Sequence, residues 1–160
     1  MKWRMLLIPM LALTAHARHA EADGNAPWGT AAVIEQVYRG QKVVFDTTAG
    51  SPAGLTSTLD RASFLSMLNG ADPLENRIVI VLHGGAIPFF AIKNHAKNKD
   101  LMQRAQSLSV GDVVEYRMCG AAARMQGFSP EDIHGFIKMV PMADAEIVRL
   151  QQEEDFAYMK

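Results

Sequence analysis

The residue best suited to chemistry in this 160-residue chain is its single cysteine, Cys119. It follows the strand-like run 113–118 and precedes the alanine-rich run 120–126, where a strand is expected to give way to a helix. Unpaired backbone N–H groups and the helix dipole favour a thiolate at such a position. We therefore expect Cys119 to be a solvent-reachable thiol that reacts near neutral pH. The competing interpretation is a small buried side chain, which is common for free cysteines.

His83 is the second candidate, because it ends the apolar run 77–82 and is followed by Gly84 and Gly85. A histidine at a strand end can face the same crevice as Cys119 and accept or donate a proton there. Capping its own loop is an equally good interpretation. Gly84 and Gly120 are the candidate positions at which a ligand or cofactor approaches the backbone closely.

The sequence gives no reason to expect a specific cofactor. The pair Gly84-Gly85 lacks the third glycine of a dinucleotide fingerprint, and no GxxxxGK[ST] phosphate loop occurs. Neither a CxxC pair nor an HxxxH pair occurs, so no metal site is expected. The methionines are scattered along the chain and are expected to fill the core.

Strands and helices alternate along the chain. Runs 42–46, 77–82, 113–118, 136–140 and 155–159 are expected to be strands, and helical spacing of apolar residues separates them. Thr56 or Ser57 is expected to cap the first helix. The unbroken apolar run 77–82 predicts a strand covered on both faces. We predict a flavodoxin-like three-layer α/β sandwich with a mostly parallel five-stranded sheet and right-handed crossovers, whose strand order the sequence leaves open.

In such a sheet the ligand site lies beyond the carboxyl ends of the strands. Three loops qualify here, namely 46–54, 83–90 and 119–120. The apolar cluster 88–90 lies in one of these loops. It is expected to pack under a helix, and the alternative is a contact between subunits.

The first 22 residues have the order of a secretory signal. Lys2 and Arg4 precede the apolar run 5–13, and small residues follow, with cleavage expected after Ala17 or Ala22. We expect residues 1–22 to be removed, residues 23–40 to form an N-terminal arm, in which residues 31–38 can form a short helix, and residues 41–160 to form one domain. The mature chain would then be periplasmic, without a membrane span, and its slightly acidic charge gives no reason to expect a nucleic-acid partner.

Several segments resemble the DsrE/DsrF-like family of small α/β proteins of sulfur relay, in an exported branch of that family. They are KVVF (42–45), VLHG (81–84), YRMCG (116–120), VPMADAEIVRLQ (140–151) and FAY (156–158). The resemblance covers residues 41–159 and implies a flavodoxin-like domain that assembles into trimers or larger oligomers. It also implies that Cys119 carries sulfur as a persulfide.

Three functions remain open from the sequence. The first is a sulfur carrier, at most a sulfurtransferase-like enzyme, in which Cys119 exchanges sulfur with donor and acceptor proteins or small sulfur compounds. The second is a non-catalytic small-ligand-binding domain whose crevice Cys119 lines, and the third is a structural oligomer. A thiol-disulfide oxidoreductase is disfavoured, because the chain has no resolving cysteine.

Overall fold

A computed structural model describes residues 27–68 and 70–160 of the chain. Residues 27–36 belong to a separate unit from the compact domain Val37–Lys160. Residues 30–41 form neither helix nor strand, so the short helix considered for residues 31–38 is not formed. The expected signal and its cleavage sites lie outside the described residues. Within the described ranges, no helix is long and apolar enough to cross a membrane.

The domain is built on one five-stranded sheet in which every pairing is parallel. Its strands are β1 (Lys42–Thr47), β2 (Arg77–Leu82), β3 (Val114–Cys119), β4 (Ile137–Val140) and β5 (Ala157–Met159). They lie in the order β4-β3-β2-β1-β5. The prediction of an α/β sandwich with a parallel five-stranded sheet is confirmed, and the structure supplies the strand order.

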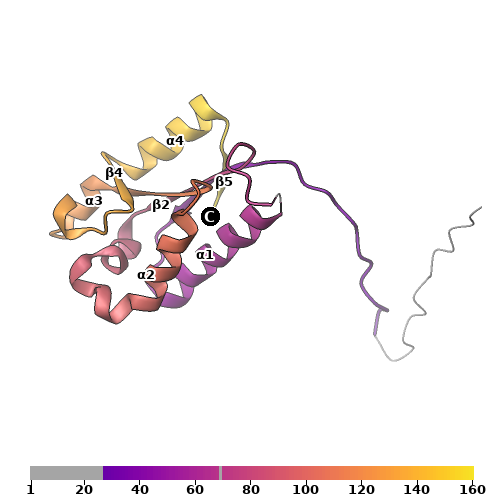
Figure 1. The fold of residues 1–160 in the computed structure, drawn as a ribbon, viewed down its shortest axis with the longest axis horizontal. Coiled ribbons are helices and arrows are strands. Elements are labelled where there is room, and N and C mark those ends of the chain that lie inside the picture. Colours follow the sequence, from indigo (N-terminus) through magenta and orange to yellow (C-terminus); the bar gives the residue numbers. More distant parts are fainter. Residues whose placement is uncertain (1–26, 69) are drawn as a thin grey trace, which may run out of the picture. The chain divides into compact units, whose positions relative to one another are not determined.

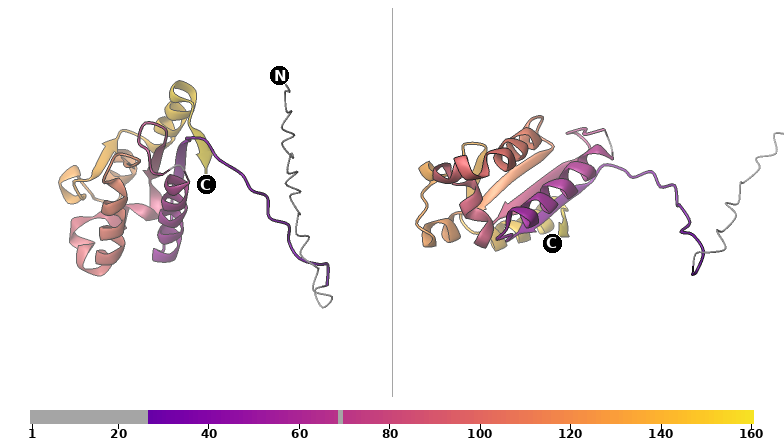
Figure 2. Two further views of the ribbon diagram at one scale, coloured as in Figure 1. Left: turned by 45° about the vertical axis from the view of Figure 1, so that its right-hand side comes forward. Right: turned by 90° about the horizontal axis from the view of Figure 1, so that it is seen from below.

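Helices cover both faces of this sheet (Figures 1 and 2). The helical elements are α1 (Pro52–Met67), the 3-10 helices η1 (Gly84–Phe90) and η2 (Ile92–Asn94), α2 (His95–Ser109), α3 (Gly120–Met125), η3 (Pro130–Asp132) and α4 (Ala143–Glu154). The chain steps from β1 to β4 in one direction, so right-handed crossovers put α1 and α2 on the same face. The return from β4 to β5 runs in the opposite direction, and α4 therefore covers the other face.

The core divides into two clusters, one on each face of the sheet. Alternation along β1 sends Phe45 to the face of α1 and α2, and it sends Val44 to the face of α4. Neighbouring strands follow the same rule, which makes β2 apolar on both faces, as predicted from its unbroken run.

Two local predictions are tested by the helices. The expectation that Thr56 or Ser57 caps the first helix is wrong: Ser51 is the cap, and its Oγ accepts the N–H of Gly54 at 3.2 Å. The helix begins earlier because Pro52 occupies its first position, where a proline is well tolerated. Residues 88–90 end η1, and of these Phe90 is fully buried as predicted, whereas Pro88 and Phe89 are partly exposed.

Ion pairs fasten α4 to the sheet. The Arg117 guanidinium on β3 bridges Glu115 of its own strand and Glu146 of α4. Arg149 also binds Glu146, at 2.8 Å. The hydrogen bond from Arg149, together with that from Arg117, lowers the pKa of Glu146. The Arg117 and Glu146 side chains are only 12% and 13% exposed. Because desolvation offsets much of the attraction in a buried ion pair, this pair orients α4 more than it stabilises it.

Candidate functional site

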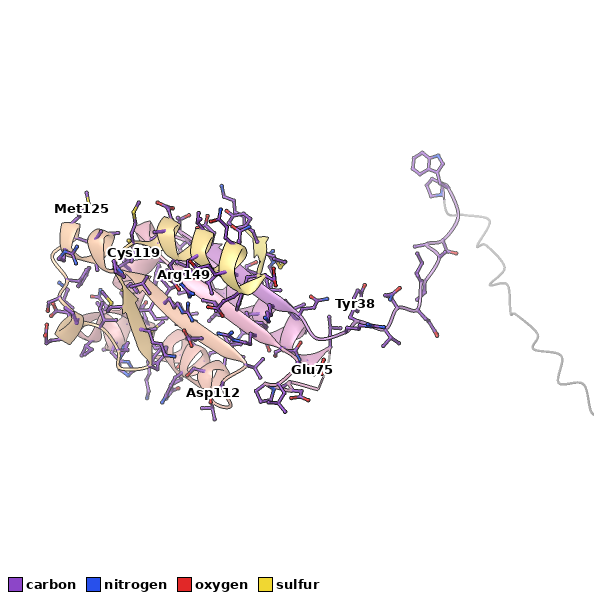
Figure 3. All side chains as sticks on the ribbon, turned by 90° about the horizontal axis from the view of Figure 1, so that it is seen from above. Tyr38, Glu75, Asp112, Cys119, Met125 and Arg149 are labelled. Carbon is purple, nitrogen blue, oxygen red and sulfur yellow. The ribbon has the colours of Figure 1, made fainter. Side chains whose placement is uncertain are left out.

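Cys119 is the last residue of β3 and the cap of α3. Its Sγ accepts a hydrogen bond from the backbone N–H of Ala122 at 3.4 Å. Figure 3 shows Cys119 at the start of α3, beside the amino-terminal part of α4. The sequence correctly located this cysteine at a strand-to-helix junction, where a backbone N–H is directed at the sulfur.

The expectation that Cys119 is solvent-reachable is corrected by its burial, because only 5% of the residue is exposed. Strand alternation directs its side chain to the face that α4 covers, and there it packs in one cluster with Ala143 and Ile147. A reactant therefore reaches Sγ only when the edge of the sheet or α4 opens.

The position of Cys119 in the topology is nevertheless that of a ligand site. The connection after β3 leads to the face of α1 and α2, whereas the connection after β4 leads to α4 on the opposite face. Parallel sheets bind ligands at such a switch point, outside the carboxyl ends of the strands. Cys119 is therefore at the switch point between β3 and β4.

Backbone contacts close this switch point tightly. A Cβ on Gly120 would meet the Val140 carbonyl oxygen at 3.0 Å, and the Ala121 N–H donates to the Pro141 carbonyl at 3.1 Å. Because Gly120 has no side chain, the start of α3 can pack closely against residues 140–141. This packing explains a glycine at position 120 without any ligand.

His83 extends β2 by one residue. Its N–H donates to the Thr47 carbonyl at 3.0 Å, which continues the ladder between β1 and β2. Leu82 pairs with Met118, so the parallel register brings His83 level with Cys119 on the adjacent strand. Both side chains point to the face of α4, because each follows a residue of the opposite cluster.

Asp46 and Tyr158 complete a chain of polar contacts with His83. The His83 Nε2 and Asp46 Oδ1 atoms are 2.5 Å apart, and the Tyr158 hydroxyl donates to Asp46 Oδ2 at 2.6 Å. Val44 pairs with Tyr158 across β1 and β5, which puts the tyrosine on the same face. Asp46, His83 and Cys119 therefore follow one another across three neighbouring strands.

The charge state of Asp46 determines which ring nitrogen of His83 carries a proton. Burial opposes ionisation of this carboxyl, but the hydrogen bonds from His83 and Tyr158 together outweigh it and lower the pKa of Asp46. The same bond raises the pKa of the Tyr158 hydroxyl. A carboxylate only accepts hydrogen bonds, so Nε2 of His83 must carry a proton. In the neutral ring, Nδ1 is then the nitrogen that can accept one.

Gly84 and Gly85 also have structural reasons for being glycine. Gly84 adopts a φ of +53°, which disfavours residues with a Cβ, and a Cβ on Gly85 would lie 2.7 Å from the Gly50 Cα. The Gly84 carbonyl accepts a hydrogen bond from Gln126 Nε2 at 2.9 Å. The segment after α3 is thereby tied across the carboxyl edge of the sheet to the turn after β2.

The sequence predicted site roles for Cys119 and His83 but none for Asp46 or Tyr158. Asp46 could have been found, since it ends the first apolar strand run at the predicted ligand edge. Tyr158 could not, because nothing in the sequence shows that β5 pairs with β1. Among residues 27–68 and 70–160, no group of three or more His, Cys, Asp or Glu side chains could hold a metal ion.

Comparison with known proteins supports the fold alone. No protein-family model matches the chain, and no curated protein matches it. The chain is similar to the solved structure of MTH1491, a protein of unknown function from Methanobacterium thermoautotrophicum. The two are 19% identical with a TM-score of 0.57, and the match covers 74% of this chain and 97% of the other. At this identity the similarity concerns the α/β architecture and not the chemistry.

Proposed function

We propose that this protein carries sulfane sulfur as a persulfide on Cys119 and passes it to a partner thiol. Cys119 carries the transferred sulfur, and His83 accepts the proton of its thiol. Asp46, together with Tyr158, orients His83. The observation that carries the proposal is the alignment of these side chains on one face of the carboxyl edge. A nucleophile beside a base that a third group orients is the usual arrangement for activating a thiol.

The transfer requires no external oxidant or reductant. The Cys119 thiol gives its proton to His83, and the thiolate attacks the outer sulfur of a donor persulfide, R–S–SH. The donor S–S bond breaks as the new one forms, and the departing thiolate takes the proton from His83. The products are Cys119–S–SH and R–SH. The same exchange with an acceptor thiol regenerates the Cys119 thiol.

Intact mass spectrometry tests the transfer directly. The protein is incubated with a small-molecule persulfide, desalted, and compared with the Cys119→Ser variant. We expect the unsubstituted chain to gain the mass of one sulfur atom and the serine variant to gain none. Equal gains in both proteins, or no gain in either, would contradict the proposal.

The role of His83 has its own test. We expect His83→Ala to slow persulfide formation by about 100-fold, the low end of the range for loss of a positioned base. His134→Ala is the matched control, because His134 belongs to a different part of the domain and should leave the rate unchanged. An unaltered rate in His83→Ala would remove His83 from the proposal while leaving Cys119 in it.

A second candidate function is favoured by the burial of Cys119. With 5% of its surface exposed and Ala143 and Ile147 packed against it, the cysteine also suits a structural or small-ligand-binding domain without thiol chemistry. Alkylation by iodoacetamide separates the two candidates. Reaction of the folded protein supports the carrier, whereas reaction only after denaturation supports the structural domain.

The wider expectations belong to the same proposal. Membership of the DsrE/DsrF-like family, export to the periplasm after cleavage at Ala17 or Ala22, and assembly into a homo-oligomer are all proposed from the sequence. Amino-terminal sequencing of protein recovered from the producing cell tests export, and an intact Met1 would contradict it. Light scattering tests assembly, and a monomer at micromolar concentration would contradict it.

A further inference from the structure

A second polar site lies on the face of the sheet opposite to Cys119. A cavity of about 400 Å³ opens between α2 and the segment that leads into β4. His95 and His134 line it together with Met102 and Phe136. Met102 belongs to the core cluster on the side of α1 and α2, whereas Cys119 belongs to the other cluster. The sheet therefore separates this cavity from the candidate site.

The two imidazoles contact each other edge to face. Their ring centroids are 5.2 Å apart and their planes meet at 73°. Two imidazoles that bind one zinc ion through nitrogens at about 2.1 Å, each about 1.1 Å from its ring centroid, place the centroids about 5.2 Å apart at the tetrahedral angle. The observed centroid spacing is compatible with a shared cation, and it also lies within the ordinary range for edge-to-face ring contacts.

His134 also has an unexplained polar atom. Its Nε2 is buried without a hydrogen-bond partner, and such atoms in folded proteins usually have one. The backbone N–H of His134 donates to the Phe90 carbonyl at 3.1 Å, and the Phe136 ring stacks on the imidazole with the ring centroids 5.9 Å apart. Both contacts leave the Nε2 of His134 without a partner in the part of the chain that the structure describes.

We propose that His95 and His134 bind one divalent transition-metal ion of the class that prefers imidazole, Zn²⁺ or Cu²⁺. The remaining coordination positions are filled by water and by the side chains of Gln103 and Gln106, which also line the cavity. Cu²⁺ is expected to bind more tightly than Zn²⁺, because it stands above zinc in the Irving–Williams order for imidazole ligands. The two histidines are far apart in the sequence, which explains why no metal-binding spacing predicted them.

Isothermal titration calorimetry on the untagged full-length chain tests this site. Cys119→Ser, His16→Ala and His19→Ala are introduced first, because a thiol and further histidines would compete for the metal. Zinc chloride is titrated into this protein, and copper is titrated in the presence of glycine as a competing ligand. We expect one site per chain, with tighter binding of Cu²⁺ than of Zn²⁺.

Substitutions in the cavity then assign the ligands. His95→Ala and His134→Gln should each weaken binding at least about tenfold, since each removes one of two imidazole ligands. Glutamine keeps most of the side-chain volume of His134. His83→Ala is the matched control and should leave the affinity unchanged.

Absence of saturable binding would overturn the inference. So would equal affinity in His95→Ala, or an equal loss in His83→Ala. None of these outcomes depends on Cys119, which has already been replaced, so this inference and the sulfur-carrier proposal succeed or fail separately.

Discussion

The packing of α4 on the sheet should control how fast Cys119 reacts, and replacement of Ile147 by alanine measures this. Ile147 is 6% exposed and lies in the same cluster as Cys119. Truncation of a buried isoleucine to alanine costs about 2 to 5 kcal/mol, and the low end suits a site at the margin of the core. We take about 2 kcal/mol as the loss.

That loss of stability predicts a change in the alkylation rate of Cys119. If Cys119 reacts only when α4 detaches, a local opening that becomes easier by about 2 kcal/mol speeds alkylation by about 30-fold. The assay follows iodoacetamide labelling of the folded protein by intact mass, at a concentration where opening and closing are faster than labelling. Urea unfolding of the same variant gives the change in the free energy of unfolding.

Leu59→Ala is the matched control. Leu59 is fully buried on α1, on the opposite face of the sheet, and its truncation should cost at least as much stability. We expect it to leave the labelling rate of Cys119 almost unchanged while the protein stays folded. Equal acceleration in both variants would mean that Cys119 reacts through global unfolding, and the reasoning about α4 would be refuted.

Three further predictions concern stability. Asp46→Asn should lower the free energy of unfolding at neutral pH, because the lowered pKa of Asp46 stabilises the folded protein at pH values above the ordinary pKa of an aspartate. The difference in stability between the variant and the unsubstituted protein should shrink as the pH falls below about 4, and urea unfolding across pH checks this. Phe90→Ala should cost about 3 to 5 kcal/mol by the same measurement, since this ring is fully buried. Gly85→Ala should cost about 1 to 3 kcal/mol because its Cβ would meet the Gly50 backbone, whereas Gly135→Ala, with open space around it, should cost little.

The sequence also predicted much of the candidate site. Cys119 lies at a strand-to-helix junction and His83 at a strand end, because strand-like runs followed by glycine mark these positions without tertiary information. Exposure was predicted wrongly for Cys119. Whether the side chain after Met118 faces solvent or a helix depends on which face α4 covers, and the local pattern carries no information on that.

The alternation of strands and helices, the parallel sheet and its apolar central strand were determined by the sequence alone, since hydrophobic periodicity depends on neighbours along the chain. The tertiary structure decided which strands lie side by side. The order β4-β3-β2-β1-β5 brings Tyr158 to Asp46 and puts Cys119 at the switch point. It also brings His95 against His134 through the packing of α2. These contacts join residues distant in sequence, and packing of the complete core, rather than any local preference, selects them.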